Sequence, residues 1–160
     1  MSPAISTTTV TVNAAFLQEI KQVNEELWQT LKEVRQRAES QVLQRADAWR
    51  FLHQLAQLRD QLAFHFTLEE AYGYFEDPID VAPRLCRQAN QLRSEHRELY
   101  LMVVDLGEAS ELLTQRNRIS GTVMTAVKQF QAFDERLHRH ESLENELIMQ
   151  EYGDDIGVGD

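Results

Sequence analysis

The sequence predicts an all-α protein, namely an antiparallel up-down-up-down four-helix bundle built from a helical hairpin that occurs twice. Long stretches rich in Leu, Gln, Glu and Arg hold few of the six glycines and three prolines, which argues against an all-β fold. Apolar residues recur every three or four positions in four stretches, as they do in amphipathic helices. Two short motifs also recur at similar spacings, which indicates an internal repeat.

The first predicted helix follows Asn13, because an asparagine side chain can cap a helix N-terminus. Its apolar stripe consists of Phe16, Ile20, Val23, Leu27, Leu31, Val34 and Ala38. The stripe of the second helix consists of Leu52, Leu55, Leu58, Leu62, His65, Glu69 and Tyr72. Gly73 and the proline-containing segment 77–83 mark the end of this second helix.

The third helix is expected to start near Pro83, because proline suits the first turn of a helix. Its stripe consists of Leu85, Ala89, Leu92, His96, Leu99, Val103 and Leu106. A polar stretch around 107–121 contains the next break. The stripe of the fourth helix consists of Val123, Val127, Phe130, Phe133, Leu137, His140, Glu144 and Leu147.

Four long helices with short connections form one domain over residues 13–152. Residues 1–12 are assigned to an N-terminal arm, and the acidic, glycine-rich residues 153–160 to a solvated or loosely docked tail. Because the hairpin repeats, a pseudo-twofold axis should bring the second and fourth helices together across the core. No shift in composition indicates a second domain.

Composition narrows the expected partners and location. A net charge of −10 argues against nucleic acid and anionic membranes as partners. The single cysteine, Cys86, has no internal disulfide partner and fits a reducing compartment. The first twelve residues lack basic residues and a continuous apolar region, so they do not resemble a secretory signal, and no apolar run is long enough to span a bilayer. We therefore expect a cytoplasmic protein.

A repeated histidine–glutamate pair predicts a metal site. His65-Phe-Thr-Leu-Glu69 and His140-Glu-Ser-Leu-Glu144 lie 75 positions apart. Residues four apart lie on one helix face, about 5–6 Å from each other, so each pair can reach one cation. Segment 23–28 resembles segment 95–100, which makes His96 a fifth candidate and places Asn24 at the corresponding position.

All five candidates interrupt leucine-rich stripes, where a buried carboxylate needs a partner or a metal ion. Buried His–Glu hydrogen bonds are the alternative, because such pairs can satisfy one another in part. Imidazole and carboxylate ligands suit iron, manganese or zinc. His138 is expected on the surface and His53 at the edge of the core, so both are excluded from the ligand set, which consists of His65, Glu69, His96, His140 and Glu144.

These residues resemble the hemerythrin-like, or HHE cation-binding, family over roughly residues 13–152. The family pattern has a histidine on the first and third helices and an HxxxE motif, or a variant of it, on the second and fourth. The resemblance implies a non-haem di-iron centre with bridging glutamates, held by His65, Glu69, His96, His140 and Glu144. It also implies a protein that binds dioxygen, senses oxygen or iron, or handles nitric oxide or peroxide.

The chain departs from the family pattern at Asn24, where a histidine is expected. An amide carbonyl is a poorer ligand for iron than imidazole, so a single iron is an alternative to two. The family's oxygen carriers usually have a second histidine one turn along the third helix, where this chain has Tyr100, or Leu92 in the other direction. Reversible oxygen carriage is therefore not expected.

Three functions remain open from the sequence. The first is a metal protein that binds or senses dioxygen or another small oxidant. The second is an oxidase- or peroxidase-like enzyme on the same centre, with Tyr72 and Tyr100 as candidate redox or proton-donating groups. The third is a metal-depleted bundle that acts as an interaction scaffold, which the missing histidine at Asn24 favours.

Overall fold

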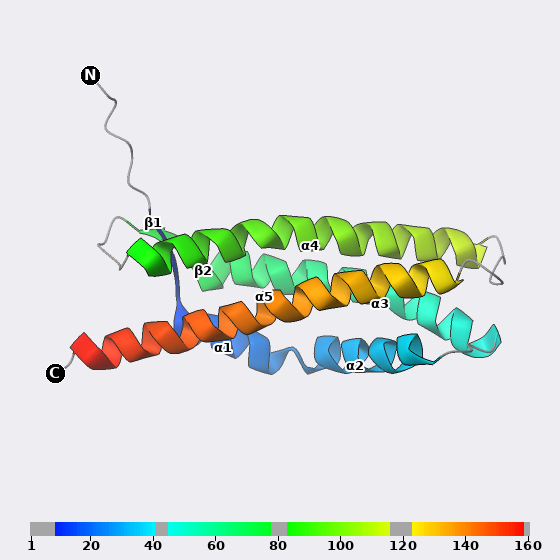
Figure 1. Cartoon of the computed structure of the whole chain (residues 1–160), viewed down its shortest axis with the longest axis horizontal. Helices are drawn as coiled ribbons and strands as arrows, with labels where there is room; N and C mark the ends of the chain where they lie inside the picture. The colour runs from blue at the N-terminus through cyan, green and yellow to red at the C-terminus, as the bar shows by residue number, and fades with distance from the viewer. Residues whose placement is uncertain (1–8, 41–44, 78–82, 116–122, 159–160) are drawn as a thin grey trace, which may run out of the picture.

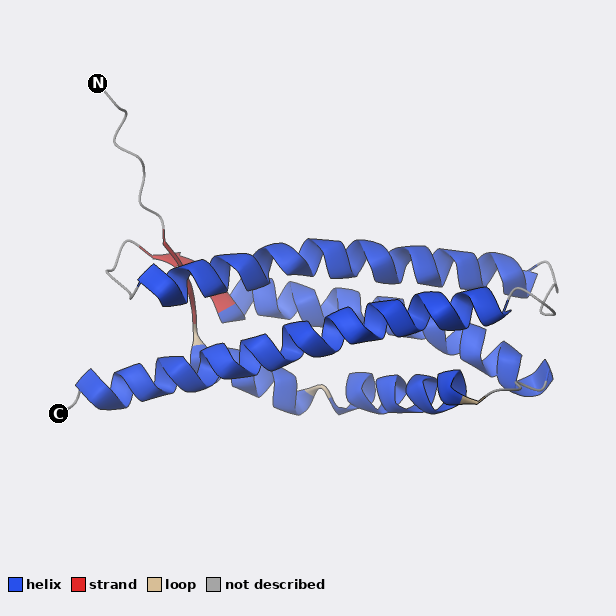
Figure 2. Ribbon diagram, in the orientation of Figure 1, coloured by secondary structure: helices blue, strands red, loops and turns tan. Residues whose placement is uncertain are grey.

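The computed structural model describes residues 9–40, 45–77, 83–115 and 123–158. The elements follow the order β1 (Thr9–Val12), α1 (Ala14–Val23), α2 (Glu25–Glu39), α3 (Arg45–Leu68), the π-helical turn η1 (Glu69–Gly73), β2 (Tyr74–Asp77), α4 (Pro83–Gln115) and α5 (Val123–Val158). Figure 1 shows the helices running along one common long axis, and Figure 2 shows the two short strands near one end. α3 packs on α4, α4 on α5, α2 on α3 and α1 on α5. The predicted helical fold class is confirmed, with a small sheet added.

The first predicted helix is divided into α1 and α2. α1 begins as predicted, because the Oδ1 atom of Asn13 accepts a hydrogen bond from the Phe16 amide at 3.2 Å. The division falls at Asn24, whose φ of −93° and ψ of 54° depart from helical geometry. The buried face of α1 therefore does not continue the stripe of α2. Phe16 and Val23 are exposed, so the stripe prediction was wrong for these two residues.

A tryptophan side chain compensates for part of this interruption. In a continuous helix the Lys21 carbonyl would accept a bond from the amide four residues later, and a break removes that partner. Here the indole Nε1 of Trp28 donates to the Lys21 carbonyl at 2.6 Å. The contact holds the end of α1 against the first turn of α2, beside the buried polar residues described below.

The end of α3 also differs from a simple helix. η1 continues α3 with one wider turn, and such π-helical turns are frequent at functional sites. β2 follows and pairs antiparallel with β1, with Val12 opposite Tyr74. β1 thus joins part of the segment assigned to an N-terminal arm to the rest of the fold. At Gly73 an added Cβ would lie 2.8 Å from Cδ1 of Leu17, so glycine allows the close approach of α1 to η1.

The last two helices are longer than their stripes. α4 begins at Pro83, as predicted, and ends at Gln115. Residues 116–122, which hold the later part of the predicted break, lie outside the described residues. α5 runs to Val158 and so continues into the segment 153–160 that was assigned to a tail.

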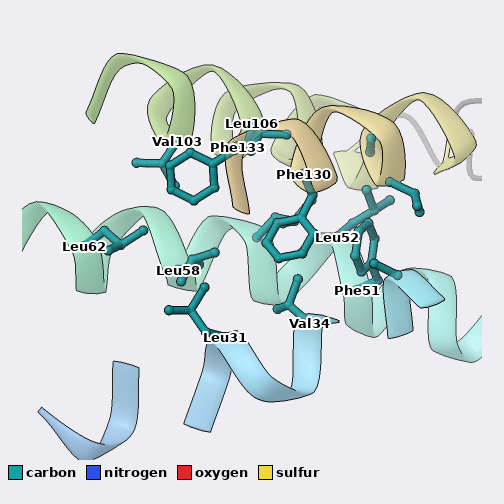
Figure 3. Close-up of a cluster of buried hydrophobic side chains, with 14 of the residues drawn as sticks. Leu31, Val34, Phe51, Leu52, Leu58, Leu62, Val103, Leu106, Phe130 and Phe133 are labelled. Carbon is teal, nitrogen blue, oxygen red and sulfur yellow. The ribbon is translucent and has the colours of Figure 1, made fainter. Parts of the chain in front are cut away.

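The core consists of two apolar clusters. The larger cluster joins α2, α3, α4 and α5, and Figure 3 shows its leucine, valine and phenylalanine side chains converging from these helices. The smaller cluster joins β1, α1, Tyr74, the start of α4 and the later part of α5. Among the described residues, no helix combines the length and apolar character needed to cross a membrane.

Candidate metal centre

The five predicted ligands lie in a polar layer between the two apolar clusters. Leu62, Leu99 and Leu137 belong to the larger cluster, whereas Leu92 and Leu147 belong to the smaller one. His65 and Glu69 come after Leu62 in the chain. His96 lies between Leu92 and Leu99, and His140 and Glu144 lie between Leu137 and Leu147. All five side chains are buried, with exposed fractions of 0 to 4 % for His65, Glu69, His96, His140 and Glu144. The predicted burial of the ligand set is therefore confirmed.

The first half of the layer is built around Glu144 of α5. Its Oε2 atom lies 3.2 Å from Nε2 of His96 and 3.3 Å from Nε2 of His140. The centroids of the two imidazole rings are 4.8 Å apart. One potential ligand atom from each of these three residues falls within a cluster 4.8 Å across, which is a spacing that a single cation can bridge.

The second half of the layer is built around Glu69, the first residue of η1. Its Oε1 atom lies 2.8 Å from Nε2 of His65, although the geometry does not make a hydrogen bond between them. Glu141, which the sequence analysis did not select, supplies the third potential ligand within 4.8 Å of the other two. The two predicted His–Glu pairs thus repeat the same contact in space, and each gains a third group.

Each histidine is held at its outer nitrogen by a residue of a neighbouring element. The Nδ1–H groups of His96 and His140 donate to Oε1 of Glu70 at 2.7 Å and to Oε1 of Glu95 at 2.9 Å. These carboxylates fix the tautomer, because a carboxylate only accepts, and they leave Nε2 facing inward. Histidines that bind metals usually have such an outer partner, which orients the ring.

Asn24 plays the same outer role for His65. Its amide nitrogen lies 2.9 Å from Nδ1 of His65, which is the nitrogen that points away from Glu69. The repeat in the sequence predicts Asn24 at a ligand position equivalent to that of His96. In the structure Asn24 instead lies behind a predicted ligand, because the chain is not helical at this residue.

Two further buried groups reach Glu144. The Lys21 ammonium of α1 lies 2.8 Å from Oε1 of Glu144 and also contacts Oε2 of Glu141. The Tyr74 hydroxyl donates to Oε2 of Glu144 at 2.6 Å. Glu144 therefore contacts three side chains from three other elements, besides His140 on its own helix.

The pKa values of the buried groups shift in opposite directions in the two halves of the layer. Burial lowers the pKa of His65 to about 4, so this imidazole is neutral at neutral pH. Burial also opposes charge on His96, but hydrogen bonds to Glu144 and Glu70 outweigh it and raise the pKa of His96 to about 10. Burial, followed by the charges of Glu144 and Glu141, raises the pKa of Glu69 well above its usual value. Burial would raise the pKa of Glu144 too, but Lys21 and the two histidines hold it well below the usual value.

Comparison of the chain with models of protein families, with curated proteins and with solved structures found no match. The fit of the site to a metal ion is therefore judged from its own chemistry. Within the described residues, five buried atoms of this layer make no hydrogen bond: Nε2 of His65, both carboxylate oxygens of Glu69, Nε2 of His140 and Oε1 of Glu141. Buried polar atoms normally have partners. Imidazole nitrogens and carboxylate oxygens without partners, facing one another, fit a metal ion of the iron, zinc or manganese type.

The other candidates of the sequence analysis lie away from the layer or at its edge. His138 is exposed, as expected, and His53 is exposed as well, rather than at the edge of the core as predicted. Tyr72 is 60 % exposed and Tyr100 is 42 % exposed, whereas Tyr74 is buried against Glu144. An open cleft of about 680 Å³ reaches the layer from the α3–α4 side, and its lining includes Phe66, Glu70, Arg93, His96 and Tyr100.

Sequence reasoning missed five residues that touch the predicted ligands. Three of these, Glu70, Glu95 and Glu141, are sequence neighbours of Glu69, His96 and His140, which was an available signal. Lys21 lies four residues after Leu17 and three before Asn24, so these residues share a helix face, which the stripe read from Phe16 does not include. Tyr74 lies in a strand that the helical pattern did not predict.

Proposed function

We propose that this protein is a hemerythrin-like metal-binding protein whose non-haem iron centre binds or senses dioxygen or another small oxidant. The centre would draw on His65, Glu69, His96, His140 and Glu144. One observation carries the proposal: the Nε2 atoms of His96 and His140 converge on Glu144, while both Nδ1–H groups are held by carboxylates. Iron held by these residues would supply redox and Lewis-acid chemistry.

The architecture that we propose for this function is the antiparallel up-down-up-down four-helix bundle. α1 and α2 together would form its first helix, followed by α3, α4 and α5, with residues 13–152 as one domain. The repeated His–Glu contacts on α3–η1 and on α5 support the pseudo-twofold relationship. A cytoplasmic location accompanies the proposal, because the single cysteine suits a reducing compartment.

The cleft between α3 and α4 supports a small-molecule partner. His96 lines this cleft and also contacts Glu144, so one imidazole separates the cleft from the centre. The Phe66 ring stacks on His96 with centroids 4.8 Å apart and lies 6.0 Å from the His65 ring. This apolar ring lets only small molecules reach the proposed centre, which favours an uncharged oxidant over a bulky substrate.

Elemental analysis tests the proposal. The protein is purified without added metal, reconstituted anaerobically with Fe²⁺, desalted, and measured for iron and for its optical spectrum before and after exposure to air. We expect bound iron and a spectrum that changes with air. His96→Ala and His140→Ala should lose the iron, whereas His53→Ala and His138→Ala, at exposed positions, should keep it. A wild-type protein that retains no iron contradicts the proposal.

A metal-depleted scaffold is the second candidate, and Lys21 favours it. Its ammonium already provides a cation between Glu141 and Glu144. The same analysis separates the two functions, because a scaffold retains no metal and shows equal stability with and without Fe²⁺. The oxidase- or peroxidase-like alternative would use Tyr74 rather than Tyr72 or Tyr100, and it requires turnover of peroxide or dioxygen by the iron-loaded protein.

A further inference from the structure

A lysine side chain enters the proposed centre from α1. The side chain of Lys21 is 10 % exposed, and its ammonium contacts carboxylate oxygens of both Glu141 and Glu144. Lysine is rarely buried unless it is paired. Here it is paired with two carboxylates that also belong to the two potential metal-binding groups.

This contact divides the two oxygens of Glu144 between different partners. Oε2 faces His96, His140 and the Tyr74 hydroxyl, whereas Oε1 faces the Lys21 ammonium. A carboxylate that bridges two metal ions needs one oxygen for each ion. With Oε1 held by Lys21, Glu144 can serve as a ligand on the His96 side but has no oxygen for an ion on the other side.

The second potential group also includes a carboxylate that contacts Lys21, although Oε1 of this carboxylate makes no hydrogen bond. Glu141 is its third ligand, and the Lys21 ammonium contacts Oε2 of that carboxylate. A divalent ion held by Glu141 would therefore share the carboxylate with a fixed positive charge. Like charges at such short range in a buried layer repel strongly, since little water screens them. The ammonium offsets the carboxylate charge in place of a second ion.

The tautomers of the histidines also favour metal binding on the side of His96 and His140 rather than on the side of His65. His96 and His140 donate from Nδ1 to carboxylates, which leaves a lone pair on Nε2 once each ring is neutral. The Asn24 amide nitrogen faces Nδ1 of His65. In this orientation the amide donates, so the ring proton of the neutral imidazole is on Nε2, the nitrogen that faces Glu69. His65 therefore presents a proton where His96 and His140 present a lone pair.

We propose that the Lys21 ammonium acts as a built-in cation on the His65 side, so that the centre binds a single metal ion at His96, His140 and Glu144. This inference rests on the proposed metal-binding function and specifies its stoichiometry. It further implies that removing the ammonium, with rotation of the Asn24 amide, opens a second site at His65, Glu69 and Glu141.

Metal counting in a small set of variants tests this inference. Wild-type protein and Lys21→Met are titrated anaerobically with Co²⁺ and followed by absorption, and Fe²⁺-loaded, desalted samples are measured for metal content. We expect one ion per chain for the wild type and two for Lys21→Met. Lys21→Arg keeps the charge and should stay at one, as should Lys32→Met, which removes an exposed lysine. Adding Glu141→Gln to Lys21→Met should return the count to one.

The outcomes separate this inference from the function on which it rests. Two ions in the wild type, or one ion in both the wild type and Lys21→Met, overturn the role of Lys21 and leave metal binding intact. No ion in the wild type overturns the proposed function itself. If Lys21→Met does not fold, Lys21→Gln replaces it, and the end point of the wild-type Co²⁺ titration still decides between one ion and two.

Discussion

The Asn24 amide nitrogen lies 2.9 Å from Nδ1 of His65, on the side of the imidazole that faces away from Glu69. Asn24 therefore positions a buried histidine rather than acting as a ligand. Its place depends on the break between α1 and α2, since a helical residue 24 would continue the face of α1.

Asn24→Ala should destabilise the protein without changing the number of bound ions. A buried imidazole that loses its hydrogen-bond partner costs about 1–3 kcal/mol. Urea unfolding of the metal-free protein measures this loss, and Asn90→Ala, at an exposed position of α4, is the matched control. A loss of metal from Asn24→Ala would instead show that Asn24 belongs to the ligand set.

The two central glutamates should respond in opposite ways to replacement by glutamine in the metal-free protein. Glu144 is charged and pairs with Lys21, so Glu144→Gln leaves a buried ammonium short of a partner and should cost about 3–5 kcal/mol. Burial raises the pKa of Glu69 well above its usual value, which favours its uncharged form, so Glu69→Gln should change the stability little or raise it. Denaturant unfolding of both variants checks this contrast. Equal losses would contradict the assigned charges.

The metal-free protein should be less stable at alkaline pH than near pH 6.5. The folded-state pKa of His96 is about 10, above its ordinary value of 6.5, because bonds to Glu144 and Glu70 outweigh burial. A raised pKa gives stability that is fully present below 6.5 and is lost as the pH rises toward 10. The raised pKa of Glu69 acts in the same direction above its ordinary value of 4.5.

Acid should destabilise the protein as well, since burial lowers the folded-state pKa of His65 to about 4. Between pH 6.5 and 4 the unfolded chain binds a proton at His65 and the folded protein does not, so the free energy of unfolding falls as the pH drops through this range. Urea unfolding from pH 4 to 10 measures the loss of stability on both the acid and the alkaline side. His96→Gln should flatten the loss on the alkaline side. Bound metal should reverse that alkaline trend, because metal displaces protons from its ligands. An alkaline loss unchanged in His96→Gln would refute this assignment.

Tyr74→Phe should lower the free energy of unfolding, because it removes a hydrogen bond from β2 to Glu144. The lost hydroxyl donates to Oε2 of Glu144, and hydrogen bonds to charged groups contribute about 1.5–3 kcal/mol. We expect a loss of this size in the metal-free protein, measured by chemical unfolding. Tyr72→Phe, at an exposed position, should have no effect. If both variants unfold at the same denaturant concentration, the Tyr74 contact contributes nothing.

The helical fold and the buried ligand set could be predicted because both follow from one periodicity. His65, Glu69, His96, His140 and Glu144 occupy positions at which a leucine stripe continues, so burial followed directly from spacing. The same reasoning failed at Phe16 and Val23, because the break at Asn24 gives α1 its own register.

The surroundings of the ligands could not be predicted from that periodicity. Glu70 contacts His96 across α3–η1 and α4, and Glu95 contacts His140 across α4 and α5. Such contacts depend on how two helices are rotated against each other, which a single stripe does not specify. Tyr74 reaches Glu144 through a strand that pairs with β1, and long-range strand pairing leaves little signal in a helical pattern.

Locating a bound ion tests the central claim most directly. Crystals of the protein loaded with Fe²⁺ are measured on both sides of the iron absorption edge, and the anomalous difference map gives the position of the metal. We predict one peak among Nε2 of His96, Nε2 of His140 and Oε2 of Glu144, within bonding distance of all three atoms, with Lys21 still in contact with Oε1. An iron-loaded crystal with no peak among these three atoms would contradict the account.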